Sequence, residues 1–410
     1  MDNAIAREKV ERHFEAIMRI GERPVGSRGG ARAEAYVESI LRGAGYEVSR
    51  AEYGCADWKL GDCSLRSGGS ALLATANPFS PSVRAEGEAM LASSLDELRA
   101  ARIEGRILVL GPELCGFPIM PKAFDYYNPE EHRALVALLE AGKPAAVVAI
   151  SPHAEGIWPV LADPDLALSS VTVPSGAAPL VGAGSRLELL IEATTRPSRG
   201  ATVSGVLRRG AEGAKRRLLC AHLDTKHYTP GALDNGGCVA ALLAAAELTA
   251  ARGASTRAAR DGAPDLEVVF FMGEECNAYG EKAWLAARGG TVADISFAMN
   301  CDGAGGTEGA GGAGGSTALS FFNFPDEAKA TVMAVAARVG RFSEMTPWYE
   351  SDHYLFWPAG IPTIAATSSD PHRFDRLIHT PADLPALVDL DLLAELAELA
   401  TYLVLEKDRA

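Results

Sequence analysis

Apolar residues recur along this chain at two spacings, one typical of helices and one typical of strands. Over residues 4–20 they fall three or four positions apart, which predicts an amphipathic helix. The same spacing over 31–41 predicts a second helix, which ends before Gly43 and Gly45. Residues 46–53 predict a strand, so the chain opens with two helices followed by a strand.

From residue 218 onward, predicted strands alternate with predicted helices. The strands are expected at 218–222, 266–272, 295–301 and 316–322, and the helices at 237–251, 279–288, 325–339 and 389–405. The strand 266–272 is apolar throughout, as a strand covered on both faces requires. This alternation predicts an α/β fold with a mostly parallel, mixed central sheet flanked by helices.

The residues between 55 and 200 differ in composition and are rich in glycine, proline, serine and alanine. Short β-like runs are expected at 107–110, 146–150 and 187–191, with a helical stretch at 132–141. We therefore expect a β-rich domain, residues 55–200, inserted into a main domain formed by residues 1–54 and 201–410.

The composition narrows the classes of partner. The chain has 410 residues and a formal net charge of −14, which makes nucleic acid an unfavourable partner. No stretch approaches the ~18 uninterrupted apolar residues of a membrane span, and no apolar run follows the first residues, so neither a membrane span nor a secretion signal is expected. Seven cysteines without regular spacing are typical of a reducing compartment. We therefore expect a cytoplasmic protein with no nucleic acid or membrane partner.

A glycine-rich stretch spans residues 303–315 and contains a formal G-x-G-x-x-G at Gly309, Gly311 and Gly314. A dinucleotide-binding turn of this pattern leaves a strand and opens a helix. Here the predicted strand 316–322 follows, so a surface loop is the favoured interpretation and no nucleotide cofactor is expected.

Acidic and histidine residues gather where predicted strands end or helices begin. They are His222, Asp224, Asp234, Glu274, Glu275, Asp302 and, near the C-terminus, His379. Alternation along the strand places His222 and Asp224 on one face. Taken singly, each has an ordinary structural role: an Asp-Asn-Gly-Gly run is commonly a turn, and adjacent glutamates commonly begin a helix. The set is more informative, because ligand sites of open α/β sheets lie at the carboxyl ends of the strands.

Two imidazoles and three carboxylates from this set form a mixed nitrogen and oxygen ligand set, which suits zinc or a similar divalent ion. Five ligands are too many for one catalytic zinc ion that must keep an open position. They suit two metal ions that share a bridging carboxylate. The residues therefore predict a two-metal site.

Six short motifs follow one another along the chain. They are AHLD at 221–224, GALDN at 231–235, GEE at 273–275, CD at 301–302, SDH at 351–353 and HTPAD at 379–383. In this order they resemble the M28 metallopeptidases, over residues 201–410 and over the N-terminal helices with Arg23–Ser27. The resemblance implies the phosphorylase/hydrolase-like fold of the zinc peptidases.

The same resemblance implies a role for each metal ligand. Asp234 is expected to bridge two Zn²⁺ ions. His222 and Asp302 are expected to complete one zinc site, and Glu275 and His379 are expected to complete the other.

Residues around the ligands also receive roles from the resemblance. Glu274 is expected to be the general base. Asp224 is expected to orient His222, and Asp383 is expected to do the same for His379, because a carboxylate partner fixes the tautomer of a metal-binding imidazole.

Four further positions complete the implied site. The Asp234–Asn235 peptide bond is expected to be cis, and Asp352 and His353 belong to the SDH motif. Some relatives carry tyrosine immediately before the last histidine ligand, where this chain has Ile378. Tyr354 is one candidate for a phenol that stabilises the oxyanion, and a packed aromatic side chain is the alternative.

The implied activity is that of an aminopeptidase acting on peptides with a free N-terminus. Two metal ions share a water and lower its pKa, and Glu274 takes the proton of that water and later passes one to the leaving amine. The insertion resembles, more weakly, a protease-associated domain, through residues 105–110 and 142–148.

Three other functional classes are alternatives to the peptidase. Glutaminyl cyclases share the fold but use a single zinc ion, and some proteins of the fold have lost their ligands and act as non-catalytic binding modules. All five ligand positions are filled here, which favours the peptidase and leaves these two alternatives open. A serine hydrolase is disfavoured, because the chain has no G-x-S-x-G motif.

Overall fold

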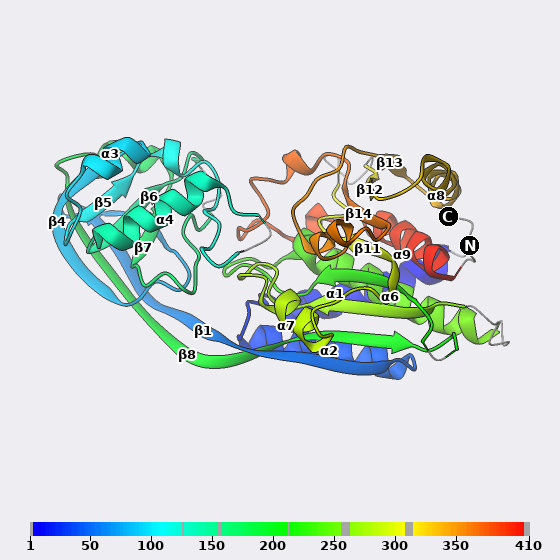
Figure 1. The fold of residues 1–410 in the computed structure, drawn as a ribbon. Coiled ribbons are helices and arrows are strands. Elements are labelled where there is room, and N and C mark those ends of the chain that lie inside the picture. Colours follow the sequence, from blue (N-terminus) through cyan, green and yellow to red (C-terminus); the bar gives the residue numbers. More distant parts are fainter. Residues whose placement is uncertain are drawn as a thin grey trace. The chain divides into compact units, whose positions relative to one another are not determined.

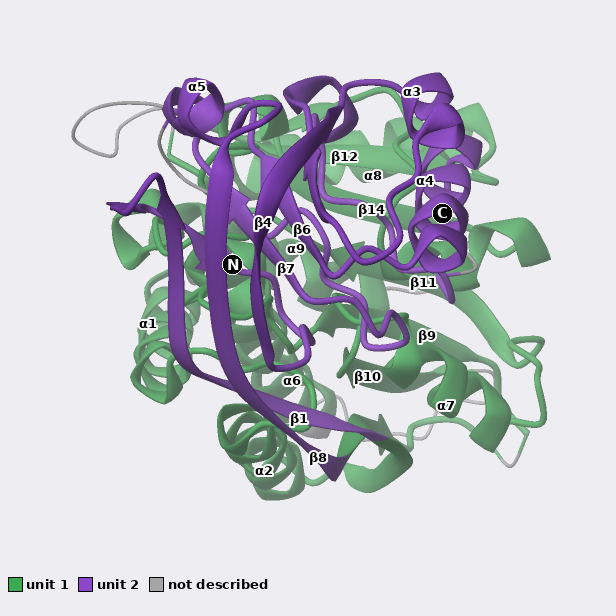
Figure 2. Ribbon diagram, turned by 90° about the vertical axis from the view of Figure 1, so that its left-hand side faces the viewer, with its two compact units in different colours: residues 1–54, 199–410 green, residues 55–198 purple. Residues whose placement is uncertain are grey.

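The computed structural model describes residues 3–124, 127–154, 158–211, 213–255, 263–307 and 315–405. The core of the predicted glycine-rich loop, residues 308–314, lies outside the described residues. The chain divides into two compact units, residues 1–54 with 199–410 and residues 55–198, which are coloured separately in Figure 2.

Two long strands belong to both units. β1 (Glu47–Ser67) and β8 (Arg186–Leu207) pair with each other and run through both boundaries. The expected domain limits at 55 and 200 lie within two residues of the limits between the units, and both fall inside these strands.

Three helices of unit 1 pack together: α1 (Asn3–Ile20), α6 (Gly237–Ser255) and α9 (Leu390–Leu405) (Figure 1). Residues 238–246 of α6 are all fully buried, as expected of a helix that is apolar all round. α2 (Arg28–Gly43) follows α1. Ser27 is its N-cap residue, and the Ser27 hydroxyl accepts a hydrogen bond from the Gly30 N–H.

The strands of unit 1 form a mixed sheet. Their order is β13 (Phe342–Glu344), β12 (Thr317–Phe322), β14 (Thr363–Ser368), β11 (Ile295–Cys301), β9 (Arg216–His222), β10 (Asp265–Phe271) and β8. The four strands β14, β11, β9 and β10 are mutually parallel, and β12 and β8 flank them in the antiparallel sense.

The predicted α/β class with a mostly parallel sheet is therefore confirmed. The strands expected at 218–222, 266–272, 295–301 and 316–322 are present, with ends that shift by at most two residues. β14 was not predicted, because its sequence TIAATS is a short run of small residues without alternation. Its burial at every position comes from neighbours distant in sequence.

Two further helices of unit 1, α7 (Tyr279–Ala287) and α8 (Asp326–Val339), lie close to their predicted limits. α7 is joined to β10 by the GEE motif, residues 273–275. Its Trp284 packs edge-to-face on Phe271 at the end of β10, with ring centroids 5.5 Å apart. This packing places the start of α7 beside the carboxyl end of the sheet.

Unit 2 is an α/β unit of its own. Its strands are β2 (Ser70–Leu72), β3 (Thr75–Ala76), β4 (Val83–Ala92), β5 (Ile107–Leu110), β6 (Ala146–Ile150) and β7 (Ser170–Val173), and its helices are α3 (Leu95–Ala100), α4 (Glu130–Gly142) and α5 (Ala178–Val181). The strands β4 to β7 are parallel. Leu108, Leu135 and Val147 pack in its apolar core.

Among the described residues, no helix has the length and apolar character needed to cross a membrane.

Candidate metal centre

The parallel strands bring the predicted ligands to one edge of the sheet. β9 ends at His222, which pairs in register with Phe271, the last residue of β10. β11 ends at Cys301, immediately before Asp302. Because parallel strands end together at the same edge, His222, Asp302 and the GEE motif after β10 are neighbours in space.

The first ligand group consists of His222, Asp234 and Asp302. His222 Nε2 lies 3.0 Å from Asp234 Oδ1 and 3.4 Å from Asp302 Oδ1. All three ligand atoms lie within 4.8 Å of one another, a separation that lets one cation contact all three.

The second ligand group consists of Asp234, Glu275 and His379. His379 Nε2 lies 2.9 Å from Asp234 Oδ2 and 3.1 Å from Glu275 Oε1. Asp234 thus belongs to both groups and offers a different oxygen to each. The five residues predicted as ligands are brought together in the arrangement that a bridging carboxylate requires.

The charges and contacts of these residues fit cation binding. The carboxylates of Asp234, Glu275 and Asp302 carry three negative charges, and two histidines face them. Glu275 Oε1 is buried and accepts no hydrogen bond from any described residue, although His379 Nε2 is 3.1 Å away. A separation of 3.1 Å between an imidazole nitrogen and a carboxylate oxygen lets both atoms bind one ion. The residues therefore fit a pair of divalent metal ions.

The pKa values of the ligands reflect the same excess of negative charge. Burial by itself lowers the pKa of His222, but Asp302 and Asp234 raise it well above its ordinary value. Burial by itself raises the pKa of Asp234, but His222 and His379 lower it well below its ordinary value. The carboxylates at this edge therefore attract positive charge, as metal ligands must.

The loop that carries Asp234 is held from several sides. The Asp234–Asn235 peptide bond is cis, as the resemblance implies. The Asn235 side chain donates a hydrogen bond of 2.9 Å to the carbonyl of Cys301, which ties the loop to the end of β11. Gly231 begins the turn at φ 64°, where a Cβ would lie 2.2 Å from the Thr225 side chain, so glycine is required.

Asp383 lies on the Asp234 side of the site. Its two oxygens accept hydrogen bonds from the backbone N–H groups of Leu233, at 2.7 Å, and Asp234, at 3.1 Å. It therefore orients the bridging carboxylate through the backbone. The expected hydrogen bond from His379 to Asp383 is not among its contacts with the described residues, because both oxygens face the 233–234 backbone.

Asp224 is fully buried and organises the GEE motif. Its carboxylate accepts hydrogen bonds from the backbone N–H groups of Gly273, at 2.8 Å, and of Glu274 and Glu275, both at 3.2 Å. Burial raises the pKa of Asp224 to about 7, against the opposing effect of His222.

The relation between Asp224 and His222 differs from the expected one. The ring Nδ1 of His222 lies 3.2 Å from the backbone carbonyl of Asp224 and 3.8 Å from its carboxylate. The backbone carbonyl therefore fixes the ring. The carboxylate is already occupied by three N–H groups.

Glu274, the predicted general base, is half-buried and follows Gly273. Burial raises its pKa well above the ordinary value, and Glu275 and Asp302 add to this effect while His222 opposes it. The charges of ligands from both groups therefore influence the pKa of Glu274.

Asp352 and His353 of the SDH motif begin a short helical turn, Asp352–Leu355, and Ser351 precedes it. Asp352 is buried, and burial followed by Glu281 raises its pKa well above the ordinary value. His353 Nε2 lies 2.9 Å from the carbonyl of Trp348, which fixes the ring. The Tyr354 ring packs edge-to-face on Trp357 with centroids 6.0 Å apart, in line with the packed-aromatic alternative.

Lys226 is a site residue that the sequence reasoning missed. Its ammonium Nζ lies 2.9 Å from Glu275 Oε2 and donates a hydrogen bond of 2.7 Å to the Glu275 carbonyl. Burial by itself lowers the pKa of Lys226, but Glu275 raises it above the ordinary value. A weak signal was present in the sequence, because Lys226 follows Asp224 at the same two-residue spacing that separates Asp224 from His222.

Arg23 is the second missed residue, and its side chain is fully buried. Its guanidinium donates hydrogen bonds to four carbonyls, those of Gly21, at 2.9 Å, Leu223, at 2.9 Å, Pro230, at 3.0 Å, and Gly231, at 2.9 Å. Three of these carbonyls belong to the segments beside His222 and Asp234. The sequence places Arg23 in the Arg23–Ser27 motif but does not indicate a role for it.

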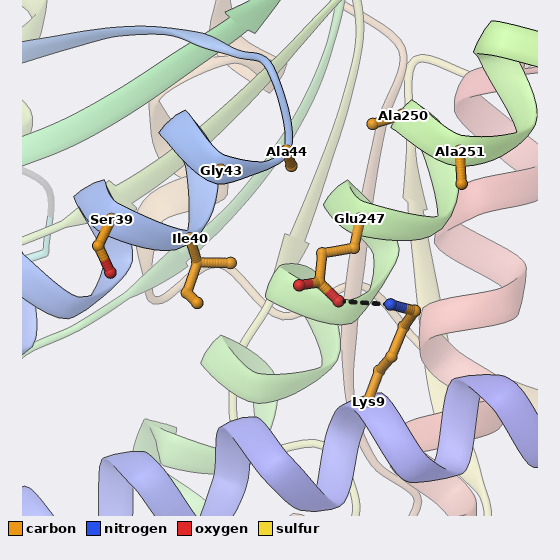
Figure 3. A pocket seen from close by; sticks show the side chains of 8 residues that line it. All are labelled: Lys9, Ser39, Ile40, Gly43, Ala44, Glu247, Ala250 and Ala251. Atoms are coloured by element: carbon orange, nitrogen blue, oxygen red, sulfur yellow. Dashed lines mark hydrogen bonds and ion pairs between the residues drawn. The ribbon is translucent and has the colours of Figure 1, made fainter.

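A separate hollow of about 530 Å³ lies between α1, α2 and α6 (Figure 3). Its lining includes Lys9 and Glu247, whose ion pair measures 2.7 Å. Glu247 also pairs with Arg12 at 2.6 Å and lies near His13. Burial raises the pKa of Glu247, but His13, Lys9 and Arg12 lower it well below the ordinary value. None of the predicted ligands lines this hollow.

Comparison with known proteins extends these observations. Residues 202–404 match the model of peptidase family M28. No curated protein sequence matches the chain.

Several solved structures share the fold. A zinc aminopeptidase from Bacillus subtilis, BSAP, has a TM-score of 0.72 at 16% identity, covering 100% of this chain and 96% of that one. An aminopeptidase from Aneurinibacillus sp. strain AM-1 has a TM-score of 0.69 at 16% identity, covering 97% and 93%. A peptidase M28 precursor from Shewanella amazonensis has a TM-score of 0.70 at 16% identity, covering 99% and 98%.

The family match covers the segment that contains all five candidate ligands, and the fold agrees with it over nearly the whole chain. The chain belongs to peptidase family M28 and is a metallopeptidase.

Proposed function

We propose that this metallopeptidase is an aminopeptidase that removes N-terminal residues from peptides with the help of two zinc ions. The observation that carries the proposal is the position of Asp234, whose two oxygens lie 3.0 Å from His222 Nε2 and 2.9 Å from His379 Nε2. One carboxylate between two histidines suits two ions better than one.

In this proposal His222, Asp234 and Asp302 hold one zinc ion, and Asp234, Glu275 and His379 hold the other. When bound, the two ions lower the pKa of a shared water and polarise the scissile carbonyl. The mixed imidazole and carboxylate ligands favour zinc among divalent metals of this size.

Glu274 is the proposed general base. Its carboxylate accepts the proton of the attacking water and then delivers a proton to the nitrogen of the leaving amine. A half-buried carboxyl group with a raised pKa suits both steps, because it holds a proton more readily than an exposed carboxyl group does. Asp224 holds the backbone of Glu274 and so fixes the starting point of its side chain.

An aminopeptidase must also recognise a free α-amine, which is positively charged. The substrate panel below tests this requirement directly, because N-acetylation removes that positive charge. Two of the solved structures that share the fold are described as aminopeptidases.

The test combines metal analysis with hydrolysis of a panel of aminoacyl-anilides, for wild type, Glu274→Gln and a matched control, Glu327→Gln. Glu327 is an exposed residue in the first turn of α8. We expect about two zinc ions per chain in all three proteins, and activity reduced about 10²- to 10⁴-fold only in Glu274→Gln. N-acetylated versions of the same anilides should not be cleaved.

Three results would contradict the proposal. Full activity in Glu274→Gln would show that Glu274 is not the general base. Cleavage of the N-acetylated anilides would show that the enzyme does not require a free N-terminus. One zinc ion per chain, with cyclisation of N-terminal glutamine in place of anilide hydrolysis, identifies the cyclase alternative.

A further inference from the structure

The two ligand groups differ in one charged neighbour, Lys226. Its ammonium lies 2.9 Å from Glu275 Oε2, and its hydrogen bond of 2.7 Å to the Glu275 carbonyl holds it there. The side chains are mostly buried, with 18% of Lys226 and 6% of Glu275 exposed. This ion pair is therefore shielded from water and is stronger than one on the surface.

The group of His222, Asp234 and Asp302 has no such neighbour. Among the described residues, the ion-pair partner of Asp302 is His222 alone, 3.4 Å away. The charge of Asp302 is thus available to a bound cation, whereas the charge of Glu275 is largely offset by Lys226. Asp234 is shared, so it does not distinguish the two groups.

Lys226 also limits how Glu275 binds. Glu275 Oε2 is occupied by the ammonium, and Oε1 points toward His379 Nε2, 3.1 Å away. A carboxylate held in this way offers one oxygen to a metal ion. Without Lys226, both oxygens become available to the same ion.

We propose that Lys226 is a positioning residue that makes the group of Asp234, Glu275 and His379 the weaker and more exchangeable of the two zinc sites. It does so by offsetting the charge of Glu275 and by restricting it to one ligand oxygen. This inference rests on the two-zinc function proposed above.

The test titrates zinc into the full-length, metal-stripped protein in competition with a chelating indicator. Wild type is compared with Lys226→Met, which removes the charge at similar length, and with Lys226→Arg, which keeps it. Lys329→Met is the matched control, because Lys329 pairs with Glu344 at 2.8 Å on an exposed part of unit 1. Circular dichroism of each protein establishes that it is folded.

Wild type should bind two zinc ions in steps whose dissociation constants differ at least about tenfold. Lys226→Met should tighten the weaker step about tenfold or more and leave the tighter step unchanged. Lys226→Arg and Lys329→Met should both behave as wild type.

Several outcomes overturn the inference while the two-zinc function stands. They are two equal steps in wild type, a weaker step that Lys226→Met leaves unchanged or weakens further, and a change confined to the tighter step. Two equal steps in wild type overturn the inference even if Lys226→Met does not fold. Fewer than two zinc ions per chain in wild type would contradict the proposed two-zinc function. The inference about Lys226 would then fail as well.

Discussion

Replacing Arg23 by methionine tests whether one buried side chain holds the metal-site loops in place. Arg23 lies on the segment between α1 and α2 and reaches the carbonyls of Leu223, Pro230 and Gly231. These carbonyls flank the loop from the end of β9 to the bridging Asp234. Methionine has a similar length and no donor, so Arg23→Met removes the hydrogen bonds with little change in packing.

The expected loss follows from the contacts. Four charge-assisted hydrogen bonds contribute about 1.5–3 kcal/mol each, or about 6–12 kcal/mol together. Burial lowers the pKa of Arg23 to about 10, so the folded protein bears a cost for the buried charge that methionine does not. Methionine avoids this cost, which is about 3.5 kcal/mol at about 1.4 kcal/mol per pKa unit. The difference is a net loss of about 2.5–8.5 kcal/mol. We expect a value in its lower half, about 3–5 kcal/mol, because that is the range found when one partner of a buried charged contact is removed.

The assay is urea unfolding of the metal-free proteins, followed by far-UV circular dichroism. Arg42→Met is the control, because Arg42 is 57% exposed and pairs with Glu38 on the same helix at 2.8 Å. Such a surface pair contributes about 0.3–0.5 kcal/mol. Zinc titration of the folded variants then reports whether the loops still present His222 and Asp234 correctly, and we expect weaker binding in Arg23→Met.

A loss below about 1 kcal/mol in Arg23→Met would refute this reasoning, since single hydrogen bonds already contribute about that much. It would mean that the four carbonyls find other partners. Normal zinc binding at reduced stability would refute only the link between Arg23 and the metal site.

Two further predictions concern other buried carboxylates. Asp224→Asn should weaken zinc binding about 10- to 100-fold, because an amide offers one oxygen to the three N–H groups of the GEE motif. Asp265→Asn, at the opposite end of β10, should leave zinc binding unchanged in the same titration. Glu247→Gln should destabilise the protein by about 1–3 kcal/mol at neutral pH. The folded-state pKa of Glu247 is lowered, so this stability is present above the unfolded value of about 4.5 and is lost as the pH falls further. Urea unfolding at several pH values should therefore show the two proteins converging in acid.

The periodic patterns of the sequence were sufficient for most of the fold. The strand β10 and the helix α6 are apolar at nearly every position, and such elements are buried whatever surrounds them. The weaker patterns predicted only parts of the long strands β1 and β8, at 46–53 and 187–191, and missed β14. Their limits depend on pairing with strands that are distant along the chain.

The ligand set could be inferred for a related reason. Imidazole and carboxylate groups at the ends of parallel strands meet at one edge of the sheet in any fold of this class. The cytoplasmic location, the zinc identity and the likeness of the insertion to a protease-associated domain stay predictions from the sequence.

The sequence by itself determined the element types, the fold class and the chemistry of the candidate ligands, because each depends on residue type and local spacing. Only the tertiary structure decided what holds those ligands. Asp383 binds the 233–234 backbone, Asp224 binds the GEE motif, and Lys226 and Arg23 reach Glu275 and the loop carbonyls. Each of these contacts joins segments about 50 to 200 residues apart. A hydrogen bond forms only when the donor–acceptor distance is right to within a few tenths of an ångström. No local pattern of residues encodes positions with that precision.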